Sequence, residues 1–87
     1  MKIKDGFKLS ELAGGFVAMR ENPDPNGITT VISLNKTSAF LWECLQNDTD
    51  RDTLVKKLTE TYAVDVVIAQ RDVDKFIENC RAADILD

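Results

Sequence analysis

Alternating apolar and polar positions in the first part of the chain predict a small antiparallel sheet. Residues 7–12 alternate with a period of two, and Gly14-Gly15 then allows a tight reversal into residues 16–20, so a β-hairpin is expected there. A third alternating run, rich in β-branched residues, covers residues 28–34. We therefore expect three strands, of which the first two form the hairpin.

The segment 21–27, between the second and third predicted strands, concentrates turn-forming residues. Its two prolines cannot donate hydrogen bonds to a sheet, and its Asn26-Gly27 pair tolerates positive φ, so an exposed loop is expected. The third strand is the last one in sequence and runs directly into the helical part. It is therefore the candidate for an open sheet edge.

Apolar residues at helical spacing predict three helices in the rest of the chain. Each helix is preceded by a residue whose side chain suits an N-cap, and these residues are Asn35, Asp50 and Asp65. The expected inward-facing residues are Ser38, Leu41, Trp42 and Leu45 in the first helix, Leu54, Val55, Leu58 and Tyr62 in the second, and Ala69, Val73, Phe76, Ile77 and Cys80 in the third. Trp42 is accordingly expected to be a core anchor rather than a platform for a ligand. The order of the elements predicts an α+β fold with a three-stranded antiparallel sheet followed by three helices.

The length and composition suit a small globular protein. The chain has 87 residues, enough for one core with shallow grooves, so residues 1–87 are expected to form a single domain. No apolar run approaches the length of a membrane span, and no segment resembles a secretory signal, so a cytoplasmic protein is expected. The net charge of −4 argues against binding to a phosphate backbone, because such binding depends on clustered lysine and arginine.

Side chains that perform chemistry are scarce in this sequence. The chain has no histidine, and its two cysteines, Cys44 and Cys80, lack the CxxC spacing of a metal site. Both cysteines lie in predicted helices, where free cysteine is commonly a small buried residue, so we expect two buried structural thiols. Paired reactive residues and a phosphate-binding glycine motif are also missing. The sequence therefore predicts a protein that is not an enzyme and uses no cofactor or metal, and its function has to be sought in its surfaces.

Three stretches of the chain follow the pattern of one protein family. They are Leu34-Asn35-x-Thr37-x-Ala39-x-Leu41-Trp42-x-x-Leu45, then Thr53-Leu54-Val55-x-x-Leu58-x-x-x-Tyr62-x-Val64-Asp65, and then Ala69-x-x-Asp72-Val73-x-x-Phe76-Ile77 followed by Ile85-Leu86. The first resembles the Leu-Asn-x-Thr-Gly-Ala-x-Ile-Trp-x-x-Leu signature of pyrroloquinoline quinone biosynthesis protein D, the PqqD family, and the others follow that family's second and third helices. The chain departs from the pattern where Ser38 replaces a glycine and where Asp84 stands at a position that is often glycine.

Resemblance to the PqqD family implies a winged helix-turn-helix-like fold that recognises ribosomally made, post-translationally modified peptides and catalyses nothing itself. Such a protein holds the leader segment of a precursor peptide and presents it to a modifying enzyme, often a radical S-adenosylmethionine enzyme. The resemblance also implies that the leader adds as a strand to the third strand, in a groove walled by the third helix. It leaves open whether the product is a cofactor, as in pyrroloquinoline quinone synthesis, or another modified peptide.

The predicted peptide-binding residues lie on these two elements, namely Thr29, Thr30, Val31, Ile32 and Ser33 on the edge strand and Val67, Ile68, Arg71 and Lys75 on the third helix. Because the three adjacent apolar residues 66–68 cannot all face one core, Val67 or Ile68 is expected to meet an apolar leader side chain. Arg71 and Lys75 lie one turn apart and are expected to meet acidic leader residues. In the alternative, the apolar residues pack against Tyr62 or the sheet, the basic residues pair with Asp72 or Asp74, and dimerisation or the amino-terminal arm covers the strand edge.

Two other functions fit the same pattern of elements. A winged-helix regulator would bind DNA through the second and third helices, but the third helix offers only Arg71, Lys75 and Arg81 among several acids. An accessory subunit would dock on an enzyme without binding its peptide. Leader binding is the favoured function, so the expected partners are a precursor leader and a peptide-modifying enzyme, with no nucleic acid and no membrane. The expected oligomeric state is a monomer or a weak homodimer.

Overall fold

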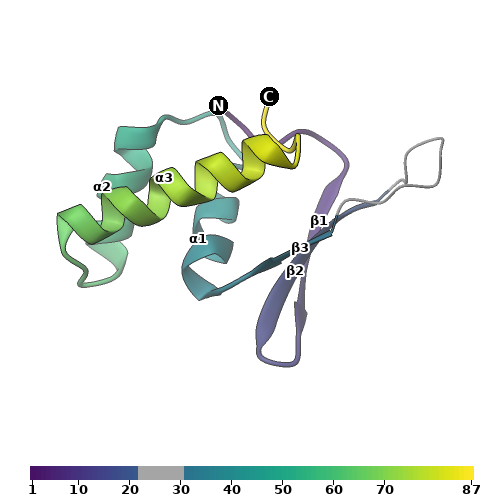
Figure 1. Cartoon of the computed structure of the whole chain (residues 1–87), viewed down its shortest axis with the longest axis horizontal. Coiled ribbons are helices and arrows are strands. Elements are labelled where there is room, and N and C mark those ends of the chain that lie inside the picture. The colour runs from purple at the N-terminus through teal and green to yellow at the C-terminus, as the bar shows by residue number, and fades with distance from the viewer. Residues whose placement is uncertain (22–30) are drawn as a thin grey trace.

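The computed structural model describes residues 1–21 and 31–87. A sheet comes first, with β1 at Phe7–Leu12, β2 at Gly15–Arg20 and β3 at Val31–Leu34. Three helices follow, with α1 at Lys36–Cys44, α2 at Arg51–Thr61 and α3 at Val66–Ala82 (Figure 1). This order confirms the fold class predicted from the sequence. The predicted loop residues 22–27 and residues 28–30 of the predicted third strand lie outside the described residues.

The three strands pair antiparallel in the order β1-β2-β3, so β2 is central and β3 lies at an edge, as predicted. β1 forms the other edge. The alternation in the sequence places Leu9, Ala18 and Ile32 opposite one another on the face that packs against the core. Leu12 and Val31 lie on the opposite face and are exposed.

The hairpin turn lies one residue earlier than the glycine pair predicts. Leu12 pairs with Gly15, so Ala13 and Gly14 form a two-residue turn and Gly15 belongs to β2. Both turn residues have positive φ, 47° for Ala13 and 84° for Gly14, as a type I′ turn requires. The predicted reversal at Gly14-Gly15 is wrong because the twist of the paired strands selects this turn, although the left-handed conformation costs alanine about 1 kcal/mol.

All three helices have the N-caps predicted from the sequence. The side chains of Asn35, Asp50 and Asp65 accept hydrogen bonds from the backbone N–H groups of Ser38, Thr53 and Val67, at 2.8, 2.7 and 2.8 Å respectively. These bonds satisfy N–H groups that have no carbonyl partner in the first helical turn. The start of each helix is therefore fixed by local sequence.

One hydrophobic core joins the sheet to the helices. Trp42 of α1 is only 2% exposed, and its ring meets that of Phe7 of β1 edge-on with the centroids 6.0 Å apart. This burial confirms Trp42 as a core residue. The predicted inward-facing residues are buried, apart from three that are only partly buried, Ser38, Tyr62 and Ile77.

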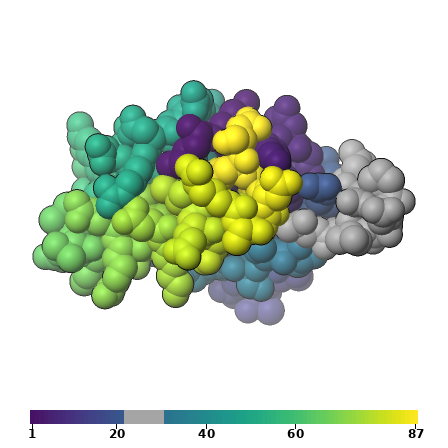
Figure 2. All heavy atoms as spheres, turned by 45° about the horizontal axis from the view of Figure 1, so that its top comes forward, coloured from purple at the N-terminus to yellow at the C-terminus, as the bar shows by residue number. Residues whose placement is uncertain are grey.

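The N-terminal segment links the C-terminal residues to the end of α1. The N–H of Ile3 donates to the carbonyl of Leu45 at 2.9 Å, and the N–H of Lys4 donates to the carbonyl of Ile85 at 2.8 Å. Ile3 also bridges to Leu86, and both side chains are buried. Figure 2 shows the purple N-terminal residues packed beside the yellow C-terminal ones. The helical layer is therefore closed by contacts between the two ends of the chain.

Asp84 shows why the family pattern often has glycine at its position. It follows the C-cap of α3 and has a φ of 57°, a left-handed conformation that glycine adopts most easily. Its carboxylate forms an ion pair with Lys4 at 2.7 Å, and the hydrogen bond from Lys4 lowers the pKa of Asp84 below its usual value. The pair is largely exposed and therefore compensates little of the backbone cost.

Candidate functional site

The pairing of β1 with β2 shows which way the backbone groups of β2 point. The N–H of Glu21 donates to the carbonyl of Gly6 at 2.7 Å, so these residues form a hydrogen-bonded pair next to the two strands. Hydrogen-bonded pairs alternate along an antiparallel ladder, so the odd-numbered residues of β2 bond to β1. The N–H and C=O groups of Phe16 and Ala18 consequently point to β3.

This alternation identifies the unpaired backbone groups at the open edge of β3. Phe16 and Ala18 lie opposite Leu34 and Ile32, so the backbone groups of these two β3 residues are used within the sheet. The N–H and C=O groups of Val31 and Ser33 point the other way, to the open edge. Two donors and two acceptors in regular alternation are what a further strand needs for pairing.

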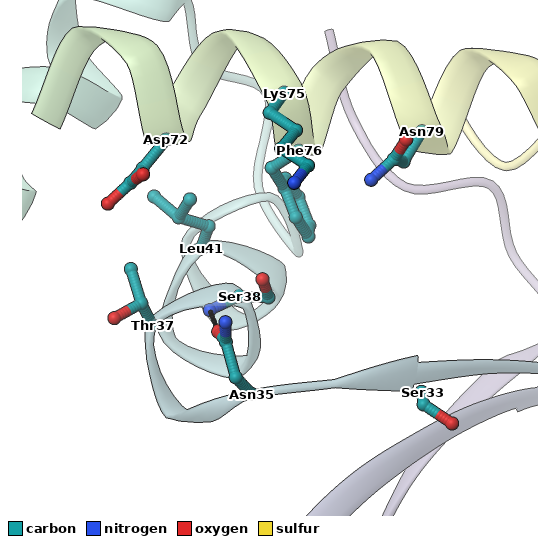
Figure 3. A pocket seen from close by; sticks show the side chains of 9 residues that line it. All are labelled: Ser33, Asn35, Thr37, Ser38, Leu41, Asp72, Lys75, Phe76 and Asn79. Atoms are coloured by element: carbon teal, nitrogen blue, oxygen red, sulfur yellow. Dashed lines mark hydrogen bonds between the residues drawn. The ribbon is translucent and has the colours of Figure 1, made fainter. Parts of the chain in front are cut away.

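A groove lies between this edge and α3, and it consists of two parts that adjoin each other. Both parts are lined by Ser33, Ser38, Phe76 and Asn79. The polar part, of about 280 Å³, is also lined by Asn35, Thr37, Leu41, Asp72 and Lys75 (Figure 3). The apolar part, of about 300 Å³, is completed by Ile32, Leu34 and Cys80.

Side chains of α3 and α1 line the interior of the groove. In Figure 3, Asp72 and Asn79 project from α3 toward α1 and β3, and Leu41 and Phe76 lie between the two walls. The side chain of Ser33 points away from α3 in this view. The groove therefore meets Ser33 through its backbone.

Asp72 and Lys75 are the charged residues of the groove, and neither forms an ion pair within the described ranges. Their neighbour Asp74 is bound by Arg51 of α2, whose guanidinium donates to both carboxylate oxygens. The hydrogen bonds from Arg51 lower the pKa of Asp74 below its usual value. Among the described residues, the alternative pairing of Arg71 or Lys75 with Asp72 or Asp74 is not observed.

The structure brings together only part of the predicted binding residues. Thr29 and Thr30 lie outside the described residues. Ile32 and Ser33 line the groove with Lys75, and Val31 lies beside them on the edge of β3. The other three predicted residues are exposed on α3 and do not line the groove, namely Val67, Ile68 and Arg71. Their exposure also shows that Val67 and Ile68 are not packed into the core.

Most of the groove-lining side chains were not predicted from the sequence. Those on α3 are Asp72, Phe76, Asn79 and Cys80, and those on α1 are Thr37, Ser38 and Leu41. The spacing 72, 76 and 79 is a helical signal that was present in the sequence. Two features depend instead on how the helices pack. One is the face of α3 that meets β3, and the other is the contribution of α1 to the wall of the groove.

The two cysteines differ in burial. Cys80 is 1% exposed in the apolar part of the groove, whereas Cys44 at the end of α1 is only partly buried. The prediction of a buried thiol is therefore confirmed for Cys80 and wrong for Cys44, which occupies the margin of the core. Burial raises the pKa of the Cys80 thiol to about 11, and partial burial also raises the pKa of Cys44.

This difference predicts selective modification of the folded protein. At about pH 8, iodoacetamide is expected to alkylate Cys44 and to leave Cys80 unmodified, because Cys80 is covered and only a small fraction is thiolate. Mass spectrometry of the folded protein and of a denatured sample measures both sites, and a Cys44→Ser variant isolates Cys80. Alkylation of Cys80 as fast in the folded variant as in denaturant would contradict the buried position.

The groove has the features of a surface that could bind an extended guest. The described residues include no cluster of three or more histidine, cysteine or acidic side chains placed to hold a metal ion. None of the helices in the described ranges has the length and apolar character needed to cross a membrane. The groove combines unpaired backbone groups, apolar surface and two charges, which suits an extended peptide.

A family model described as "Coenzyme PQQ synthesis protein D (PqqD)" matches residues 20–86. The chain belongs to the PqqD family. The match contains β3 and all three helices, so every groove-lining residue lies in the part shared with the PqqD family. The family resemblance noted in the sequence is thereby confirmed.

Two solved structures share this PqqD-family fold. "TbiB1 in Complex with the TbiA(beta) Leader Peptide" is 21% identical with a TM-score of 0.75, over 100% of this chain and 95% of that chain. "Lasso peptide synthetase B1 complexed with the leader peptide" is 18% identical with a TM-score of 0.68, over 93% of this chain and 89% of that chain. Among curated proteins, none matches the chain. At these identities the structural likeness establishes a common fold.

Proposed function

We propose that this protein holds the leader segment of a ribosomally made precursor peptide by strand addition to β3 and presents it to a modifying enzyme. The observation that carries the proposal is the row of outward backbone groups at Val31 and Ser33 beside the groove under α3. Membership of the PqqD family supports a role in peptide recognition. The two structures of similar fold are complexes with leader peptides, which supports the same class of guest.

The protein contributes binding and positioning in this proposal, and the partner supplies the chemistry. The partner is a radical S-adenosylmethionine enzyme or another peptide-modifying enzyme, and the protein itself is non-catalytic and acts as a monomer or a weak homodimer. A recognition protein of this kind has to release the modified product. Moderate affinity for the leader therefore suits the role better than very tight binding.

The described edge alone would bind a leader weakly. Its two N–H and two C=O groups allow four main-chain hydrogen bonds at about 1 kcal/mol net each, and one apolar side chain in the apolar part adds about 2 kcal/mol. Ordering a flexible leader offsets several kcal/mol of this sum. Further contacts along α3, or an enzyme that tethers the leader and raises its effective concentration, are needed for stable binding.

An amide NMR titration with the leader segment of a short peptide encoded beside this gene tests the proposal. We expect saturable shifts at Val31–Leu34 and at residues 72–79, with little change on the outer face of α2 at Lys56 and Lys57. Duplex DNA at the same concentration serves as the control for the winged-helix alternative. Absence of shifts with a leader that a neighbouring enzyme is shown to process would refute leader binding and favour an enzyme-docking subunit.

A further inference from the structure

The groove-facing side of α3 extends beyond Asp72 toward the start of the helix. Ile68 lies four residues before Asp72 and therefore on the same helical face, one turn further along. Ile68 is 44% exposed although its side chain is large and apolar. The side chain of Val67 lies about 100° away from that of Ile68 around the helix axis, so Val67 shares its face with Arg71 instead. Of the two apolar residues singled out in the sequence, Ile68 is the one that continues the groove.

This face of α3 carries apolar, charged and apolar side chains in consecutive turns. Phe76 and Cys80 line the apolar part, Asp72 lies in the polar part, and Ile68 follows. Residues four apart in a helix are separated by about 6 Å along its axis, and alternate residues of a strand by about 6.6 Å. In Figure 3 the residues from Ser33 to Asn35 run alongside α3. A guest strand paired with β3 would thus place alternate side chains on successive turns of α3.

Asp72 places a negative charge in the polar part of the groove. It is partly buried and has no ion pair within the described ranges, so a guest lying over it would cover an unpaired carboxylate. Covering an unpaired charge is strongly unfavourable, whereas a basic guest residue would pair with it. Lys75 is exposed, and its long side chain can keep the ammonium group in water.

We propose that the groove selects leaders with a specific five-residue pattern, in which the first and fifth residues are apolar and the third is lysine or arginine. One apolar side chain lies over Phe76 and Cys80, the basic residue meets Asp72, and the other apolar side chain meets Ile68. This inference rests on the proposed leader binding and identifies the leaders that the site accepts. The contact with Ile68 also supplies affinity that the short strand edge lacks.

The test uses a fluorescein-labelled leader segment of the precursor encoded beside the gene, with each position replaced in turn by alanine, lysine and glutamate. Fluorescence anisotropy is expected to show one position at which lysine binds about tenfold tighter than glutamate. Alanine at the apolar positions two residues before and after it should weaken binding about fivefold or more. In the Asp72→Lys variant, the preference at the basic position should reverse.

Two matched controls separate this pattern from general effects. Glu78→Lys makes the same charge change on an exposed part of α3 that does not line the groove, and should leave the preference unreversed. Ile68→Ser should weaken binding several-fold, whereas Val67→Ser, at the adjacent exposed position, should not. If the leader binds saturably but Asp72→Lys reverses the charge preference at none of its positions, the five-residue pattern is wrong and leader binding still holds. Absence of binding to any leader variant overturns both.

Discussion

Replacing Ser33 by proline is expected to weaken leader binding about tenfold or more while the protein remains folded. The N–H of Ser33 points to the open edge, so proline removes a donor that only the guest strand would use. The proline ring also occupies space in which the guest backbone would lie. A lost hydrogen bond of about 1 kcal/mol together with this obstruction exceeds the 1.4 kcal/mol that corresponds to a factor of ten.

The measurement pairs a leader-binding titration with denaturant unfolding followed by circular dichroism. Ser33→Ala is the matched control because it keeps the N–H, and the Ser33 side chain points away from the groove, so unchanged affinity is expected. Ile32→Pro should instead lower the free energy of unfolding, because the N–H of Ile32 faces β2. Wild-type affinity in a folded Ser33→Pro protein would rule out pairing at this edge.

Replacing Trp42 by alanine is expected to lower the free energy of unfolding by about 3–5 kcal/mol. The side chain is 2% exposed and packs against Phe7, so its loss removes apolar burial and leaves a cavity where the sheet meets the helices. A domain of this size has a total stability of roughly 4–13 kcal/mol, so the change removes a large part of it. Urea unfolding monitored by far-ultraviolet circular dichroism measures the loss without depending on tryptophan fluorescence.

Val67→Ala is the control for this prediction because Val67 is 66% exposed on α3. Its cost is expected to stay within about 0.5 kcal/mol. Trp42→Phe, which keeps an aromatic ring, should fall between the two. A cost below about 1 kcal/mol for Trp42→Ala would show that the residue does not anchor the core.

The proposed binding edge was less predictable than the helices. The β-branched run before Leu34 predicted an edge strand, which residues 31–34 form, and Lys75, one of the predicted binding residues, lines the groove. The outward direction of the Val31 and Ser33 backbone groups follows from the register of β3 on β2, which local sequence does not specify. Asp72 and Phe76 were missed as groove residues because their role depends on how α3 packs against α1 and β3.

Local sequence by itself determined the elements and the core of this protein. The N-caps Asn35, Asp50 and Asp65 fix the helix starts through hydrogen bonds within a few residues, and the helical spacing of apolar residues places Trp42 inside. The tertiary structure decided the position of the hairpin turn and the formation of the groove. Strand twist selected the turn at Ala13 and Gly14, and the groove exists only where a sheet edge and two helices converge. Such convergence depends on contacts between residues far apart in sequence, which no local pattern specifies.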